Sequence, residues 1–246
     1  MLFRSPQALS AGPASAPDPA TVLASGTVRV KGRMPWSSNA TFLAELALDG
    51  ATALAIYKPE RGERPLWDFP SGLYKREIAA YLLSDALGWG LVPLTIARDG
   101  PYGEGSFQLF VDADFEQHFF TLVEDPAHHD RLRRICVFDL LANSADRKSG
   151  HCLLGPDHAV YAIDNGLTFH VEPKLRTVIW NFGGEPIPEA VLDDVRRVFD
   201  TALPSALAAL LTNGERKVLA ARARAILGAA RFPRDDSGYR YPWPEV

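Results

Sequence analysis

The chain has 246 residues, of which 47% are hydrophobic and 23% charged, and its formal net charge is −4. This composition is typical of a globular protein and excludes a disordered or fibrous chain. The 26 basic and 30 acidic residues are mixed along the sequence, so no basic face favours nucleic acid as a partner. Because no stretch approaches about 18 uninterrupted apolar residues, and the N-terminus lacks the apolar core of a signal peptide, we expect a cytoplasmic protein without an integral membrane segment.

The chain contains two cysteines, Cys136 and Cys152. Their spacing matches neither a CxxC redox pair nor a repeated zinc-ligand pattern. We therefore expect no disulfide framework, no structural zinc and no disulfide-linked partner.

The N-terminal third changes character near residue 25. Residues 4 to 20 are rich in Pro, Ala and Ser and have few large apolar side chains, so we expect a flexible tail over 1–24. From residue 25 to 58, alternating apolar and β-branched residues predict three strands, with a Gly-containing turn at 49–50 between the second and the third. These strands predict a small antiparallel sheet.

The remaining elements predict a helix on this sheet and a second, mainly helical lobe. The expected segments are a helix over 73–89, two strands joined by a hairpin over 91–112, a helix over 125–144, two short strands within 151–164, and helices over 188–211 and 214–229. The predicted fold class is α+β with two lobes of a kinase-like fold. The expected boundaries are 25–112 for the N-terminal lobe, 113–232 for the C-terminal lobe and 233–246 for a C-terminal tail.

The order of these elements matches that of a phosphotransferase, in which a lysine on a sheet binds phosphates and later carboxylates hold a metal ion and orient the acceptor. The segments NSADRKSGHCLL, residues 143–154, and AIDNGLTFH, residues 162–170, carry the candidate carboxylates. They resemble the catalytic loop and the later metal-binding aspartate of the phosphatidylinositol 3/4-kinase-like branch of the protein-kinase fold, and more closely an actinobacterial family assigned to that branch. The resemblance covers roughly residues 25–230.

This resemblance implies roles for two aspartates. Asp146 would orient the acceptor hydroxyl, and Asp164 would hold the metal ion that bridges the phosphates of ATP. Arg147 follows Asp146 as in the family pattern, and it either stabilises phosphate charge or forms a structural pair. Lys148 stands where the lipid-kinase pattern has histidine.

The second metal ligand departs from the family pattern. His151 stands where the family has a metal-binding asparagine, and Asn143 is the alternative source of an amide oxygen. Since magnesium prefers oxygen ligands, a histidine here indicates a weaker second metal site, tolerance of manganese, or loss of that site. The implied cofactors are ATP and Mg²⁺ or Mn²⁺.

Lys58 ends the third predicted strand and resembles the lysine that binds the α- and β-phosphates in kinases. Glu77, in the next helix, is its expected ion-pair partner. The alternative is that Lys58 is a solvated residue at a strand end and that Glu77 is an ordinary surface charge.

Two further segments are candidates for nucleotide contacts. The polar turn at 36–40, with Ser37, Ser38 and Asn39, offers amides and hydroxyls that could cover phosphates, although a plain hairpin turn would have the same sequence. Residues 108–111, with Gln108 and Phe110, occupy the position of the segment that reads adenine in kinases. A buried edge strand is the alternative.

We therefore expect an ATP- and metal-dependent phosphotransferase of the phosphatidylinositol 3/4-kinase-like type that acts on a hydroxyl of an unknown protein or small molecule. One alternative is a nucleotide-binding pseudokinase with a regulatory or scaffolding role, in which Lys148 and His151 have abolished transfer. Another is a kinase-fold enzyme that transfers the adenylyl group of ATP.

Overall fold

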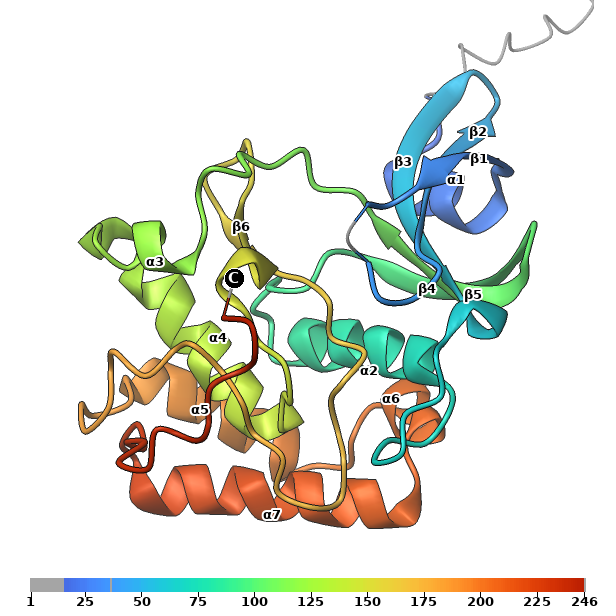
Figure 1. Cartoon of the computed structure of the whole chain (residues 1–246). Helices are drawn as coiled ribbons and strands as arrows, with labels where there is room; N and C mark the ends of the chain where they lie inside the picture. Colours follow the sequence, from blue (N-terminus) through green and yellow to red (C-terminus); the bar gives the residue numbers. More distant parts are fainter. Residues whose placement is uncertain (1–15, 36, 246) are drawn as a thin grey trace, which may run out of the picture.

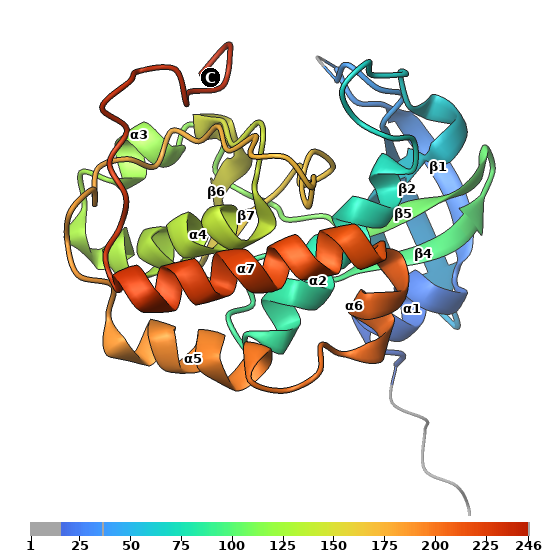
Figure 2. The same cartoon turned by 90° about the horizontal axis from the view of Figure 1, so that it is seen from below.

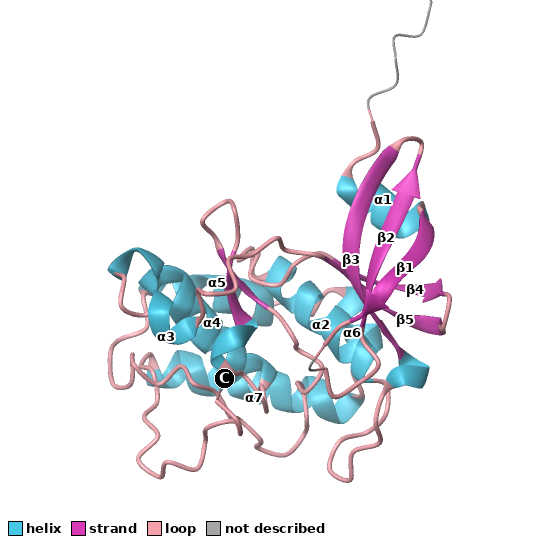
Figure 3. Cartoon of the chain, turned by 45° about the horizontal axis from the view of Figure 1, so that its top comes forward, coloured by secondary structure: helices cyan, strands magenta, loops and turns pink. Residues whose placement is uncertain are grey.

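The computed structural model describes residues 16–35 and 37–245. A twisted β-sheet occupies one end of the molecule and most helices gather at the other (Figures 1 and 3). The sheet is antiparallel, with strand order β1-β2-β3-β5-β4. Its strands are β1 (Thr27–Arg33), β2 (Phe42–Leu48), β3 (Ala51–Pro59), β4 (Thr95–Gly100) and β5 (Gly103–Leu109). The predicted α+β class with an N-terminal antiparallel sheet is thus confirmed, although β5 ends three residues before the expected Asp112.

A short helix, α1 (Pro19–Ser25), corrects the expected tail over 1–24. Asp18 caps this helix by accepting a hydrogen bond from the backbone N–H of Thr21 at 2.9 Å. Val22 and Leu23 are buried in a cluster with residues of β2, β3 and β5. Two apolar residues are too few for a sequence signal, and the sheet supplies the surface that makes their burial favourable. Residues 1–15 of the expected tail lie outside the described residues.

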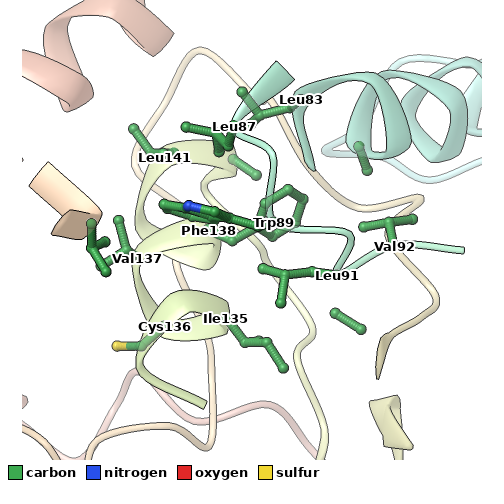
Figure 4. Packing of buried hydrophobic residues seen from close by; sticks show 14 of the residues in the cluster. Leu83, Leu87, Trp89, Leu91, Val92, Ile135, Cys136, Val137, Phe138 and Leu141 are labelled. Carbon is green, nitrogen blue, oxygen red and sulfur yellow. The ribbon is translucent and has the colours of Figure 1, made fainter. Parts of the chain in front are cut away.

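The helical region is built around one large apolar core. Its elements are α2 (Leu73–Ala86), α3 (Phe119–Leu122), α4 (His129–Ala142), β6 (Cys152–Leu154), β7 (Val160–Ala162), α5 (Glu189–Phe199), α6 (Ser205–Leu210) and α7 (Asn213–Ala229). Figure 4 shows Leu83 of α2 and Leu87, the residue that follows α2, packed near Trp89 and the α4 residues Phe138 and Leu141. Helix α7 runs across this region and contacts α4 and α5 (Figure 2). Among the described residues, no helix combines the length and apolar character needed to cross a membrane.

The single helix expected over 188–211 is two helices, α5 and α6. Pro204 lies between them and is the N-cap of α6. Proline lacks a backbone N–H and restricts the preceding residue to extended conformations, so a continuous helix cannot pass through this position. The other long helices agree with the expected segments to within a few residues at their ends.

Helix α2 connects the sheet to the helical region. It contacts β4, β5 and α6, and Arg76 on it is 7% exposed. The guanidinium of Arg76 forms an ion pair with Glu215 of α7 at 2.5 Å and also donates to the carbonyl oxygen of Thr168. Because buried charges persist only when paired, these contacts fix α2, and with it Glu77, relative to the segment around Asp164.

Candidate functional site

The alternation of β3 directs Lys58 toward the helical region. Ala55 and Tyr57 are buried on the face that packs against α1, and successive side chains point to opposite faces of a strand, so Lys58 lies on the other face. Its ammonium contacts a carboxylate oxygen of Glu77 and lies 2.7 Å from Oδ1 of Asp164. Burial alone would lower the pKa of Lys58, but these two negative charges outweigh it and raise that pKa. The predicted lysine–glutamate pair is therefore present.

Glu77 also positions the segment that carries Asp164. Its second carboxylate oxygen accepts a hydrogen bond from the backbone N–H of Asn165 at 3.0 Å. Asp164 has a φ of 56°, a left-handed conformation that aspartate tolerates better than most residues. The side chain of Asp164 is 52% exposed, and the ammonium of Lys58 holds its pKa well below the usual range. Asp164 is therefore a charged carboxylate that is accessible for ligand binding.

Residues of the loop from Asp146 to His151 contact one another, and this loop lies next to Asp164. Nζ of Lys148 lies 3.6 Å from the carboxylate of Asp146, while burial raises the pKa of Asp146 to about 6. Nδ1 of His151 lies 2.9 Å from the carbonyl oxygen of Asp146. A carbonyl only accepts, so this shorter contact is a hydrogen bond when Nδ1 carries the proton. In the other tautomer Nδ1 accepts from the backbone N–H of Lys148 at 3.3 Å. A carboxylate whose pKa lies near neutrality suits a group that accepts a proton from a hydroxyl.

His151 and Asp164 fit a divalent metal ion. Burial lowers the pKa of His151 to about 4, so the ring is neutral, and in the tautomer with the proton on Nδ1 its Nε2 has a free electron pair. Nε2 lies 3.4 Å from Oδ2 of Asp164. Two electron-pair donors at this separation suit two ligands of one cation, and a ring N–H bound to a backbone carbonyl is the usual support of a metal-binding histidine. In the described part of the chain, no cluster of three or more His, Cys, Asp or Glu could hold a metal, so these two residues would supply only part of the coordination of such an ion.

Arg147 does not face the site. It is 1% exposed and forms an ion pair with the fully buried Asp139 at 3.0 Å. Its Nη1 donates to the carbonyl oxygen of Ile163 at 2.7 Å, and its Nη2, which also contacts Asp139, donates to Oδ1 of Asn165 at 2.6 Å. Of the two roles weighed from the sequence, the structure favours the structural pair: Arg147 joins the loop after Asp146 to the segment that carries Asp164.

Asn143 is not a candidate metal ligand in this structure. It ends α4 with a φ of 55°. Its side-chain nitrogen donates to the carbonyl oxygens of His170 and Glu172, and its side-chain oxygen accepts from the N–H of Lys174 at 2.9 Å. All of its amide capacity therefore holds the loop over 170–174, which corrects the sequence-based alternative.

A cavity of about 390 Å³ joins these groups. Its lining includes Lys58, Glu77, Asp146, Lys148, His151 and Asp164, together with the predicted turn residues Ser37, Ser38 and Asn39. Two hydrogen bonds of 2.9 Å hold the described part of this turn in place. The N–H of Ala40 donates to the carbonyl oxygen of Gly62, and the N–H of Arg64 donates to Oδ1 of Asn39. A Cβ on Gly62 would lie 2.8 Å from the side chain of Ala40, so this approach requires glycine.

Gln108 and Phe110 do not line this cavity. The side-chain nitrogen of Gln108 donates to Oγ1 of Thr95 at 2.9 Å, and both residues are buried. The backbone N–H of Phe110 donates to the carbonyl oxygen of Leu54. These groups are occupied by the sheet and are not available to read an adenine edge. The segment begins at Gln108 in the buried part of β5, as in the alternative, but β5 lies between β3 and β4 and is not an edge strand.

Sequence reasoning missed Arg64, which also lines the cavity. Its guanidinium forms no ion pair or side-chain hydrogen bond with the residues that the structure describes. No motif marks this arginine, because it enters the cavity only through the turn that follows β3. The neighbouring Glu63 was also missed; its carboxylate accepts hydrogen bonds from the N–H groups of Gly72 and Tyr74 at the start of α2.

The structure resembles solved proteins of low sequence identity. Fam20 from hydra, in a structure with sugar, aligns with a TM-score of 0.50 and 12% identity, covering 85% of this chain and 86% of that chain. The Helicobacter pylori proinflammatory kinase CtkA aligns with a TM-score of 0.49 and 11% identity, covering 84% of this chain and 93% of that chain. With the antiparallel sheet and helical region described above, the likeness to Fam20 defines a protein with a kinase-like fold.

No family model matches the chain. The chain is 42% identical over 264 aligned positions to Protein Rv2133c of Mycobacterium tuberculosis, covering 92% of this chain and 95% of that protein. It therefore belongs to the same protein family as Protein Rv2133c.

Proposed function

We propose that this protein is an ATP- and metal-dependent phosphotransferase of the phosphatidylinositol 3/4-kinase-like type, acting on a hydroxyl group. The observation that carries this proposal is the ammonium of Lys58, which lies between Glu77 and Asp164 in a cavity that Asp146 also lines. The ammonium of Lys58 is suited to bind a phosphate, and the neighbouring carboxylate of Asp164 is suited to bind a metal ion that is coordinated by the same phosphate.

Each residue has a distinct task in this proposal. Lys58 would bind phosphate oxygens, and Asp164 and His151 would hold the metal ion, which supplies positive charge to the phosphates. Asp146 would orient the acceptor hydroxyl and accept its proton as the oxygen bonds to the γ-phosphorus and the bond to ADP breaks. Lys148 would offset negative charge beside Asp146.

Nucleotide binding is tested by thermal unfolding with ATP and either Mg²⁺ or Mn²⁺. At saturation, about 100 times the dissociation constant, ATP with metal should raise the unfolding temperature of a chain of this size by roughly 5–10 °C. Lys58→Met should lose most of this rise, measured relative to its own unfolding temperature. Lys31→Met removes an exposed lysine of β1 and should keep the rise. An equal rise in both variants would contradict the assigned site.

The products distinguish transfer from the two alternatives. Release of ADP with label from the γ-phosphate on the acceptor supports phosphoryl transfer. Release of pyrophosphate with label from the α-phosphate indicates adenylyl transfer. Metal-dependent binding with neither product indicates a nucleotide-binding pseudokinase.

Arg64→Gln should weaken the binding of ATP with metal by about tenfold or more, because a charge-assisted contact with phosphate contributes about 1.5–3 kcal/mol. The measurement is isothermal titration calorimetry. Arg61→Gln is the matched control, since Arg61 is exposed, lies three residues earlier and does not line the cavity. Equal affinities of the two variants would exclude Arg64 from the phosphate site.

A further inference from the structure

A second cavity of about 470 Å³ adjoins the first at Asp146. Asp146, Leu66 and Leu167 line both this cavity and the one that holds Lys58. Asp146 is the only titratable residue of these three, so its carboxylate is the polar group at the boundary. A hydroxyl in the second cavity would therefore approach Asp146 from a cavity that Lys58 does not line.

The C-terminal segment over 239–245, here called the C-terminal strap, forms one wall of the second cavity. In Figure 1 the red end of the chain returns to the middle of the molecule. The strap is held at both ends by backbone bonds: Thr177 N–H donates to Arg240 at 3.0 Å, and Ser149 N–H donates to Glu245 at 2.8 Å. Between these points, Tyr241 and Trp243 line the cavity.

The same bonds disfavour an extended peptide as the occupant. A bound peptide chain gains affinity by pairing with free backbone groups at the edge of a site. Here the N–H groups of Ser149 and Thr177, in the catalytic loop and after the metal-binding aspartate, already pair with the strap. The space that remains has the volume of a small-molecule site, about 300–1,000 Å³.

Two arginines supply positive charge next to the carboxylates of Asp68 and Asp146, which also line the second cavity. Arg176 lines the second cavity and also a neighbouring one of about 400 Å³, which Arg240 lines as well. Neither guanidinium forms an ion pair or a side-chain hydrogen bond with the rest of the described chain. Lys174, in the same neighbouring cavity, differs because it already pairs with Asp68 at 3.1 Å. Unpaired arginines suit bidentate binding of a phosphate or a carboxylate.

We propose that the cavity under the C-terminal strap is the acceptor site and that it takes a small hydroxyl compound bearing a phosphate or carboxylate group. This inference rests on the proposed phosphotransferase function. Arg176 and Arg240 hold the anionic group, Tyr241 and Trp243 pack against the body of the compound, and the hydroxyl reaches Asp146. Arg176 and Trp243 are therefore specificity-determining residues of the acceptor.

The test uses the full chain and three probes that differ in charge: glucose 6-phosphate, gluconate and glucose. Without nucleotide, the phosphate probe, the carboxylate probe or both should change tryptophan fluorescence at saturation, and glucose should not. The change should be lost in Trp243→Phe, which keeps an aromatic ring. Arg176→Gln and Arg240→Gln should each weaken binding about tenfold, whereas Arg224→Gln, an exposed arginine on α7 away from these cavities, should bind as the unmodified chain does.

With ATP and metal, the charged probes that bind should raise ADP release and receive the γ-phosphate. Binding of only one charged probe identifies the anionic group and supports the proposal. The proposal would be overturned if glucose bound as well as the charged probes, if no probe bound, or if binding were unchanged in both arginine variants. It would also be overturned if casein, added as a protein acceptor, received the γ-phosphate and none of the small probes did. The thermal rise with ATP and metal, measured on the same samples, separates the two proposals: if the rise persists while the probes fail to bind, only the acceptor site is wrong.

Discussion

Asp164→Asn is expected to abolish the metal-dependent thermal rise with ATP and to reduce γ-phosphate transfer by about 10³-fold or more. The charge of Asp164 holds the metal ion in the proposed function, and loss of several kcal/mol of charge stabilisation in the transition state corresponds to such a factor. The fold should survive, since the side chain of Asp164 is 52% exposed and Lys58 keeps its ion pair with Glu77. Initial rates of ADP release with Mg²⁺ and with Mn²⁺ give the measurement.

Asp193→Asn provides the matched control. Asp193 is an exposed aspartate of α5 that pairs with Arg196 and lines neither cavity near Asp146. This variant should keep both the thermal rise and the rate. If Asp164→Asn behaved like this control, Asp164 would not be the metal ligand.

Asp139→Asn is expected to lower the free energy of unfolding by about 3–5 kcal/mol, because it leaves the buried charge of Arg147 without its partner. Asp139 is fully buried, and Arg147 is 1% exposed. Asp139 also accepts a hydrogen bond from the hydroxyl of Thr177 at 3.0 Å. Urea unfolding followed by circular dichroism measures the change, which corresponds to a fall in unfolding temperature of roughly 6–20 °C for a chain of this size.

Glu189→Gln makes the same carboxylate-to-amide change in an exposed ion pair with Arg196. It should change the free energy of unfolding by less than about 1 kcal/mol. The double variant Asp139→Leu/Arg147→Met should recover part of the stability, since a buried pair is often replaceable by apolar residues. A loss in Asp139→Asn no larger than in Glu189→Gln would show that Arg147 is solvated in solution.

Local patterns in the sequence determined the sheet and most helices. Alternation in β2 and β3 and the turn at Asp49 and Gly50 describe neighbours along the chain, so the strands could be predicted without knowledge of the rest. The same holds for the face on which Lys58 lies. The two differences from the expected helices are also local: α1 has only two buried apolar residues, and Pro204 divides the segment 188–211 into α5 and α6.

Tertiary structure decided which charged residues meet and which are buried. Lys58 and Asp164 are 106 residues apart in sequence and 2.7 Å apart in space, and only the resemblance of the loop sequences suggested that they share a site. Two adjacent residues differ in their surroundings: Asp146 lines the cavities, whereas Arg147 is buried in an ion pair with Asp139.

The strands, the order of the chemical groups and the position of Lys58 could be predicted from the amino-acid sequence, because short-range periodicity and chain order carry that information. The packing of distant segments showed that Arg64 enters the cavity, that Asn143 supports a loop, and that the C-terminal strap contacts the loop from Asp146 to His151. The physical reason is that burial and pairing of a charge depend on segments that arrive from distant parts of the chain, and no local pattern records them.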